Sequence, residues 1–165
     1  VQSTPPEQLL TDIYIPLAQA EQKNRRTVKT VKRPVEKASA HQRILVVDDE
    51  ETVRIVVQKS LEHLGYAVDA VSSGLEAIDK YAACCGKYDL VILDMMMPGM
   101  SGDEVFYRLR DVDPRLKVLV ASGYASDERV RTVLTDGGCG FIQKPFAIEE
   151  LAAEVSKCLA VRNGE

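Results

Sequence analysis

From Arg43 onward, short apolar segments alternate with longer segments whose apolar residues recur at helical spacing. The expected strands are residues 43–49, 66–71, 88–94, 116–122 and 139–144, and the expected helices are 52–64, 73–85, 101–112, 126–138 and 147–161. Two helix starts carry serine with glutamate three residues later, the pattern of a capping box, at Ser73/Glu76 and Ser101/Glu104. Regular alternation of strand and helix predicts an α/β fold, a doubly wound five-stranded parallel sheet with helices on both faces.

Residues 1–42 lack such a period. The run "TDIYIPL" is strand-like and ends near Pro16, whereas residues 18–42 are polar, basic and interrupted by proline, as flexible linkers are. The first 42 residues have a net charge of +3 within a total of −4, but no aromatic residue lies among the basic ones. We therefore predict an N-terminal extension (1–17), a basic flexible linker (18–42) and no direct nucleic-acid binding.

The composition places further bounds on the class of protein. Hydrophobic residues make up 45% of the chain, and no apolar run approaches the roughly 20 residues that cross a membrane. With no signal-peptide pattern either, we expect a cytoplasmic protein without membrane contact. The four cysteines lack metal-ligand spacing and are expected to be plain reduced thiols: Cys84, Cys85, Cys139 and Cys158.

Four of the five predicted strands end in polar residues. They are Asp48 and Asp49, Asp94, Ser122 and Lys144. Parallel strands bring their carboxyl ends to one edge of a sheet, so these side chains are expected to converge there. Three converging carboxylates repel one another, and Mg²⁺, which prefers a few oxygen ligands, would remove that conflict. Together with the lysine and the hydroxyl, the set suits a phosphoryl group held on a carboxylate nucleophile.

Each of these residues also has a simpler interpretation. Asp48 and Asp49 could cap a helix, Asp94 could begin an Asx turn, Ser122 could be another cap, and Lys144 could be an exposed strand-end lysine. Four separate coincidences at the ends of the right strands explain the pattern less well than one shared site.

Four segments in order, "ILVVDDE", "DLVILDMMMPGMSG", "VLVASGYA" and "GFIQKPF", resemble the receiver domain of two-component response regulators, which has the chemotaxis-type fold. The resemblance covers about residues 43–162 and implies a flavodoxin-like sheet with strand order 2-1-3-4-5. It also implies that Asp94 accepts phosphate from the phosphohistidine of a histidine kinase or a phosphotransfer domain. Asp48, Asp49, Asp94 and the backbone carbonyl of Met96 would then hold Mg²⁺.

The same resemblance implies roles in signalling. Ser122 matches the switch hydroxyl, Phe141 the switch aromatic, and Lys144 the lysine that pairs with the phosphate, with a cis bond before Pro145. Phosphorylation is expected to reshape the face built from the fourth helix, the fifth strand and the fifth helix, which is also the expected surface for a homodimer. Met96 and Tyr124, each two residues beyond a site residue, would flank the attacking water, so we predict slow self-dephosphorylation.

Other functions remain open. A haloacid-dehalogenase-like phosphatase also uses an aspartyl nucleophile, but it needs a second aspartate where this chain has Met96. A dinucleotide-binding domain would need G-x-G-x-x-G after the first strand, where "DDEETV" stands. A pseudo-receiver that is never phosphorylated would act as a binding module only. For a true receiver we expect self-catalysed phosphorylation and dephosphorylation with no separate substrate.

The segment "TDIYIPLAQAEQ" resembles, more weakly, the last strand of a histidine-kinase ATP-binding domain. On that interpretation residues 1–17 are a remnant of such a domain, and the chain is the C-terminal receiver of a hybrid histidine kinase. The alternative is a stand-alone regulator with an N-terminal tail.

Overall fold

The computed structural model describes residues 42–84 and 87–161. It contains β1 (Arg43–Val47), α2 (Glu51–His63), β2 (Ala67–Val71), α3 (Gly74–Ala83), β3 (Leu90–Asp94), α4 (Gly102–Val112), β4 (Val118–Ser122), α5 (Glu128–Thr135), β5 (Gly140–Gln143) and α6 (Ile148–Ala160). All ten predicted elements are confirmed, with ends shifted by up to three residues. The predicted extension (1–17) lies outside the described residues, as does the predicted linker (18–42) except for Gln42.

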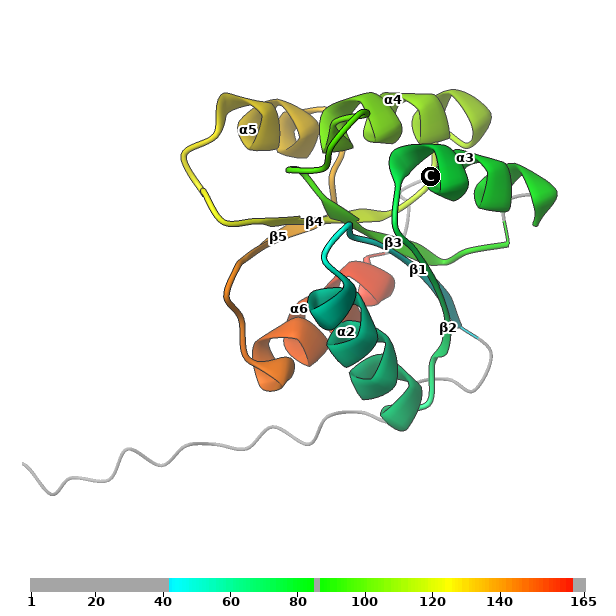
Figure 1. Cartoon of the computed structure of the whole chain (residues 1–165), viewed down its shortest axis with the longest axis vertical. Coiled ribbons are helices and arrows are strands. Elements are labelled where there is room, and N and C mark those ends of the chain that lie inside the picture. The colour runs from blue at the N-terminus through cyan, green and yellow to red at the C-terminus, as the bar shows by residue number, and fades with distance from the viewer. Residues whose placement is uncertain (1–41, 85–86, 162–165) are drawn as a thin grey trace, which may run out of the picture. The chain divides into compact units, whose positions relative to one another are not determined.

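The five strands form one parallel sheet in the order β2-β1-β3-β4-β5, which confirms the doubly wound, flavodoxin-like fold. Helices α3, α4 and α5 cover one face of the sheet, and α2 and α6 cover the other (Figure 1). No helix among residues 42–84 and 87–161 is long and apolar enough to cross a membrane.

The central strands have apolar side chains on both faces because both faces are covered. In β1, Leu45 and Val47 pack toward α3, α4 and α5, whereas Ile44 and Val46 pack toward α2 and α6. Every residue of β3 is buried, including its last, Asp94. A sheet enclosed in this way holds the carboxyl ends of its strands in fixed relative positions, and those ends carry the polar residues predicted from the sequence.

The two predicted capping boxes form differently. At α4 the Glu104 carboxylate accepts from the Ser101 backbone N–H at 3.1 Å, as expected. At α3 the Ser73 hydroxyl accepts from the Glu76 N–H at 3.3 Å, but the Glu76 carboxylate accepts from Ser72 instead of Ser73. The capping box at α3 is therefore only half formed, because the bond from the Ser73 N–H to the Glu76 carboxylate is replaced by one from the Ser72 N–H.

The prediction of reduced thiols is wrong for two cysteines. Cys139, just before β5, and Cys158, in the last turn of α6, form a disulfide with a Cα–Cα separation of 5.4 Å. That separation lies within the usual range for disulfides. The two residues are 19 positions apart, and only the packing of α6 back against β5 brings them together. Cys84 is a free thiol, and Cys85 lies outside the described residues.

Candidate functional site

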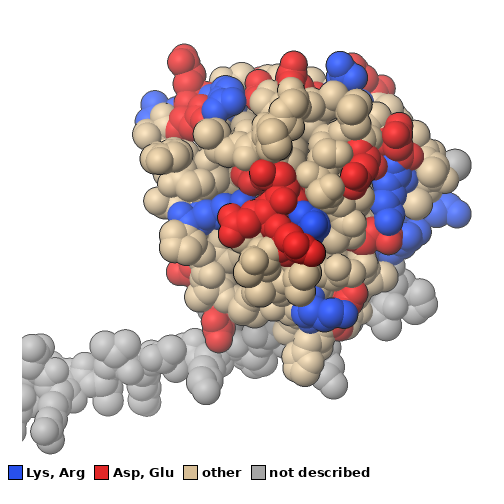
Figure 2. Space-filling model, viewed as in Figure 1, with Lys and Arg blue, Asp and Glu red and all other residues tan. Residues whose placement is uncertain are grey.

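Three aspartates from two strands meet at the carboxyl edge of the sheet. Asp48 and Asp49 follow β1 and Asp94 ends β3, and one carboxylate oxygen from each lies within 4.8 Å of the others. Asp48 and Asp94 are 4% and 5% exposed, whereas Asp49 is open to solvent. Figure 2 shows acidic side chains gathered at the centre of the viewed face, near the start of α2. The convergence predicted from the sequence is present.

Lys144, just after β5, joins the two buried carboxylates. Its Nζ donates to Asp48 Oδ2 at 2.6 Å and to Asp94 Oδ2 at 2.8 Å. Burial alone would lower the pKa of Lys144, but its hydrogen bonds to the two aspartates outweigh burial and raise the pKa. Burial raises the pKa of Asp48, and Lys144 only partly offsets that rise. One ammonium group therefore compensates a pair of nearly buried acids.

The second oxygens of the same two aspartates are held by the backbone. Asp48 Oδ1 accepts from the Glu50 N–H at 3.0 Å, and Asp94 Oδ1 accepts from the Met96 N–H at 3.1 Å. Both are bonds to a residue two positions on, as in Asx turns. The Asx turn considered for Asp94 is present, and the same carboxylate also accepts from Lys144, so the turn and the convergence of the side chains occur together.

Arg54, in α2, is a site residue that sequence reasoning missed. Its guanidinium donates to the backbone oxygens of Asp48 at 2.7 Å and Asp49 at 3.3 Å. It therefore holds the loop between β1 and α2 in the conformation that presents both carboxylates. The available signal was an arginine one helical turn into the helix after an acidic pair, but on sequence alone it is indistinguishable from a solvated helix charge.

The loop after β3 folds tightly back on the strand. Gly99 has a φ of 82°, a conformation that glycine adopts without strain, and the Gly102 N–H returns to the Met95 carbonyl at 3.3 Å. A Cβ at Gly102 would collide with the Asp94 carbonyl oxygen and lie 2.7 Å from Met95 Cα. The start of α4 can therefore pack against the end of β3 only without a side chain at this position.

Replacing Gly102 with alanine is expected to lower the free energy of unfolding by about 1–3 kcal/mol, because backbone must move to relieve the overlap. Chemical denaturation of both proteins measures the difference. Gly123→Ala is the matched control, since a Cβ there meets nothing within 4 Å. Equal losses for the two variants would show that the close approach of α4 to β3 is not what limits position 102.

Of the two predicted switch residues, Ser122 ends β4, whereas Phe141 is the second residue of β5 and lies in register with Val120. Ser122 is fully buried, and its hydroxyl oxygen accepts from the Tyr124 N–H at 3.2 Å. Phe141 in β5 is partly buried and packs against the core beneath α3, α4 and α5. The Lys144–Pro145 bond is cis, as the resemblance implied.

Two bulky residues follow the site residues closely in the chain: Met96 lies two positions after Asp94, and Tyr124 two positions after Ser122. Met96 is 51% exposed and Tyr124 is 68% exposed. A guanidinium nitrogen of Arg129, in the first turn of α5, donates to Met96 Sδ at 3.2 Å. The loop that carries Met96 is therefore in direct contact with α5, which belongs to the face expected to change on phosphorylation.

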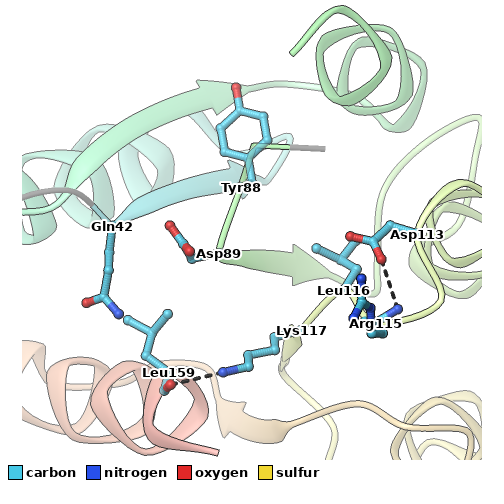
Figure 3. Close-up of a pocket in the computed structure, with 8 residues that line it drawn as sticks. All are labelled: Gln42, Tyr88, Asp89, Asp113, Arg115, Leu116, Lys117 and Leu159. Atoms are coloured by element: carbon cyan, nitrogen blue, oxygen red, sulfur yellow. Dashed lines mark hydrogen bonds between the residues drawn. The ribbon is translucent and has the colours of Figure 1, made fainter. Parts of the chain in front are cut away.

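A separate cavity of about 340 Å³ lies at the opposite, amino-terminal end of the strands (Figure 3). Its lining includes Asp89, Asp113, Arg115 and Lys117, and Lys117 Nζ donates to the Leu159 carbonyl at 2.9 Å. Charges of both signs line it, and it holds none of the converging carboxylates. We therefore place the chemistry at the carboxyl edge and not in this cavity.

A doubly wound parallel sheet with an aspartate triad and a lysine at its carboxyl edge defines the class of flavodoxin-like receiver proteins. Comparison of the sequence with protein families agrees with this: residues 44–156 match the family described as "Response regulator receiver domain". The chain belongs to the response regulator receiver family.

Among curated relatives, the chain is 36% identical over 135 residues to the sensor kinase CckA of Brucella abortus, covering 80% of this chain and 14% of that protein. It is 42% identical over 116 residues to the uncharacterized transcriptional regulatory protein YkoG of Bacillus subtilis, covering 70% of this chain and 50% of the relative. The chain thus spans half or less of the length of both relatives.

Solved structures of receiver proteins have a similar fold. The chemotaxis protein CheY4 of Vibrio cholerae has a TM-score of 0.66 and 28% identity, over 71% of this chain and 98% of its own. The response regulator TrrA of Thermotoga maritima, solved with Mg²⁺ and a beryllium fluoride, has a TM-score of 0.62 and 36% identity, also over 71% and 98%.

Proposed function

We propose that this receiver domain takes a phosphoryl group from a phosphohistidine onto Asp94. The observation that carries the proposal is the Lys144 ammonium held 2.8 Å from Asp94 and 2.6 Å from Asp48, beside a third carboxylate. An oxygen of Asp94 attacks phosphorus, the bond from phosphorus to the histidine nitrogen breaks, and imidazole leaves. The donor is a histidine kinase or a phosphotransfer domain.

The donor set fits Mg²⁺. One carboxylate oxygen from each of three aspartates lies within 4.8 Å of the others, and carboxylate oxygens are the ligands that Mg²⁺ prefers. Asp48, Asp49, Asp94 and the backbone carbonyl of Met96 would hold the ion. When bound, it supplies the positive charge that lets acids and phosphate share one site.

The protein's own groups complete the chemistry. Lys144 stays beside Asp94 and neutralises charge on the transferred group, which adds about one negative charge to the acceptor. The Ser122 hydroxyl, whose oxygen accepts from the Tyr124 N–H, turns and donates to a phosphate oxygen, and Phe141 moves into the space it leaves. The face formed by α5, β5 and α6 then changes, and it would also carry a homodimer.

Incubation with Mg²⁺ and acetyl phosphate, followed by intact mass measurement and peptide mapping, tests the proposal. One phosphate on Asp94 is the expected result. Continuous release of phosphate without a stable adduct would favour the aspartyl phosphatase, and no reaction would favour the binding module. As a receiver, the domain catalyses its own phosphorylation and dephosphorylation, without a separate substrate.

The phosphoryl group is expected to be long-lived because Met96 and Tyr124 obstruct the approach of water to Asp94. Replacing them together with asparagine and serine is expected to speed its loss by about tenfold, equivalent to about 1.4 kcal/mol of barrier. Loss of radiolabel from the isolated phosphoprotein measures the rate. Val112→Asn, an exposed apolar position at the far end of α4, is the control. An unchanged lifetime in the double variant would remove these two side chains from the explanation.

We also propose that the chain is the C-terminal receiver of a hybrid histidine kinase in the cytoplasm, with residues 18–42 as its tether. The match to the sensor kinase CckA supports this. It covers 80% of this chain, more than residues 42–165 contain, so it includes residues before Gln42. Reading the coding sequence upstream of Val1 tests the proposal. The expected result is a region that encodes dimerisation and ATP-binding domains. A start codon directly before Val1 would instead indicate a stand-alone regulator.

A further inference from the structure

The disulfide between Cys139 and Cys158 joins two elements of the face that is proposed to change on phosphorylation, β5 and α6. Cys139 directly precedes β5, which is an edge strand of the described sheet and pairs with β4. Cys158 is fully buried, whereas Cys139 is only partly buried, so Cys139 is the more accessible residue of the pair. The bond fastens the start of an edge strand to the last turn of the following helix.

The segment enclosed by this bond contains two residues of the site. Phe141 lies two positions after Cys139, and Lys144, which bridges Asp48 and Asp94, lies five positions after it. The segment then runs through nearly all of α6, which contacts both β4 and β5. Any movement of β5 against α6 must therefore occur within a closed covalent ring when the bond is present, and is freed when the bond is absent.

We propose that Cys139 and Cys158 form a reversible redox site that reacts with small disulfides of the glutathione type, and that the oxidised form restrains the phosphorylation-dependent movement of β5 and α6. The restraint rests on the proposed phosphoryl transfer, and the redox-sensing role rests on the proposed cytoplasmic location, whereas the thiol–disulfide exchange itself rests on neither. Intramolecular disulfides in a reducing compartment are usually transient and redox-sensing. A domain that receives phosphate inside the cell would carry the pair for that reason.

The exchange is balanced. The thiolate of Cys139 attacks one sulfur of the small disulfide, whose S–S bond breaks and releases one small thiol. The thiolate of Cys158 then attacks the Cys139 sulfur and displaces the second small thiol. The two protein thiols are oxidised, the small disulfide is reduced to two thiols, and the two protein protons end on those thiols. Reduction by excess small thiol is the same sequence in reverse.

The redox arm of the test uses the full chain with Cys84→Ser and Cys85→Ser, which leaves Cys139 and Cys158 as its only cysteines. The protein is equilibrated in glutathione buffers of rising oxidised fraction, alkylated under denaturing conditions and mapped by mass spectrometry. The expected result is a graded, fully reversible conversion from two free thiols to one internal disulfide. Two free thiols in every buffer, or a disulfide that persists in every buffer, would overturn the redox site.

The coupling arm compares the same protein in its reduced and oxidised forms. Each is phosphorylated with acetyl phosphate and Mg²⁺, and the amide shift changes of Gly140–Gln143 are measured. We expect these changes to fall by about half or more in the oxidised form, because the ring limits the switch. Equal changes in the two forms would overturn the restraint. Absence of phosphate on Asp94 in both forms would instead overturn the proposed function and leave the redox result standing.

Discussion

Replacing Asp94 with asparagine is expected to abolish stable phosphate incorporation from acetyl phosphate. The amide keeps the size of the side chain but removes the nucleophilic oxygen, and no acyl phosphate can form. The fold should survive, because a neutral group at position 94 relieves repulsion between two nearly buried acids that share Lys144. Radiolabel from the phosphodonor measures the chemistry, and thermal unfolding shows that the variant is folded.

Asp111→Asn is the matched control, because it removes an exposed carboxylate of α4 without touching the site. It is expected to incorporate phosphate as the wild type does. Asp49→Asn is a third variant for the same experiment. It keeps Asp94 but removes one of the three carboxylates that would hold Mg²⁺, so phosphate labelling should require a higher Mg²⁺ concentration. Labelling of Asp94→Asn at the wild-type rate would place the acceptor elsewhere and remove the basis of the proposed function.

The fold was predictable because local pattern and global architecture agree in this chain. The run ending in Asp94 is apolar at every earlier position of β3, and the structure buries all five residues of that strand. The errors in the predicted helices and strands concern only where these elements begin and end. The helix expected from residue 126 begins at Glu128, because the Asp127 side chain accepts from the Arg129 N–H and so caps α5. Such a bond depends on backbone angles that an apolar pattern does not specify.

The acidic set was predictable for a topological reason, since parallel strands deliver their carboxyl ends to one edge. The contacts that organise the set were not. Arg54 acts on backbone oxygens, and nothing in its sequence neighbourhood distinguishes it from other helix-surface charges. The disulfide depends on the distance between the start of β5 and the end of α6, which sequence spacing does not contain. Both misses involve packing between elements.

Lys144→Met is expected to lower the free energy of unfolding by about 3 kcal/mol at neutral pH without Mg²⁺, because it leaves Asp48 and Asp94 nearly buried without a cation. The loss should shrink as the pH falls. Burial already raises the pKa of Asp48 above its ordinary value, and removing the lysine removes the group that opposes that rise. In the variant, the cost of the ionised Asp48 carboxylate is present above its raised pKa and disappears as that carboxylate becomes protonated.

Added Mg²⁺ is expected to restore much of the lost stability, because a divalent cation among the three carboxylates can take over the neutralising role of the ammonium group. Urea denaturation of the variant and the wild type, with and without Mg²⁺, measures this. Lys117→Met is the matched control: its Nζ bonds the Leu159 carbonyl at the opposite end of the sheet, so any stability it loses should not respond specifically to Mg²⁺. Two results would contradict this account: Lys144→Met as stable as the wild type without Mg²⁺, or equal stabilisation of both lysine variants by Mg²⁺. Either result would show that Lys144 does not compensate the charge of the acidic site. The charge balance proposed for phosphoryl transfer would then be wrong.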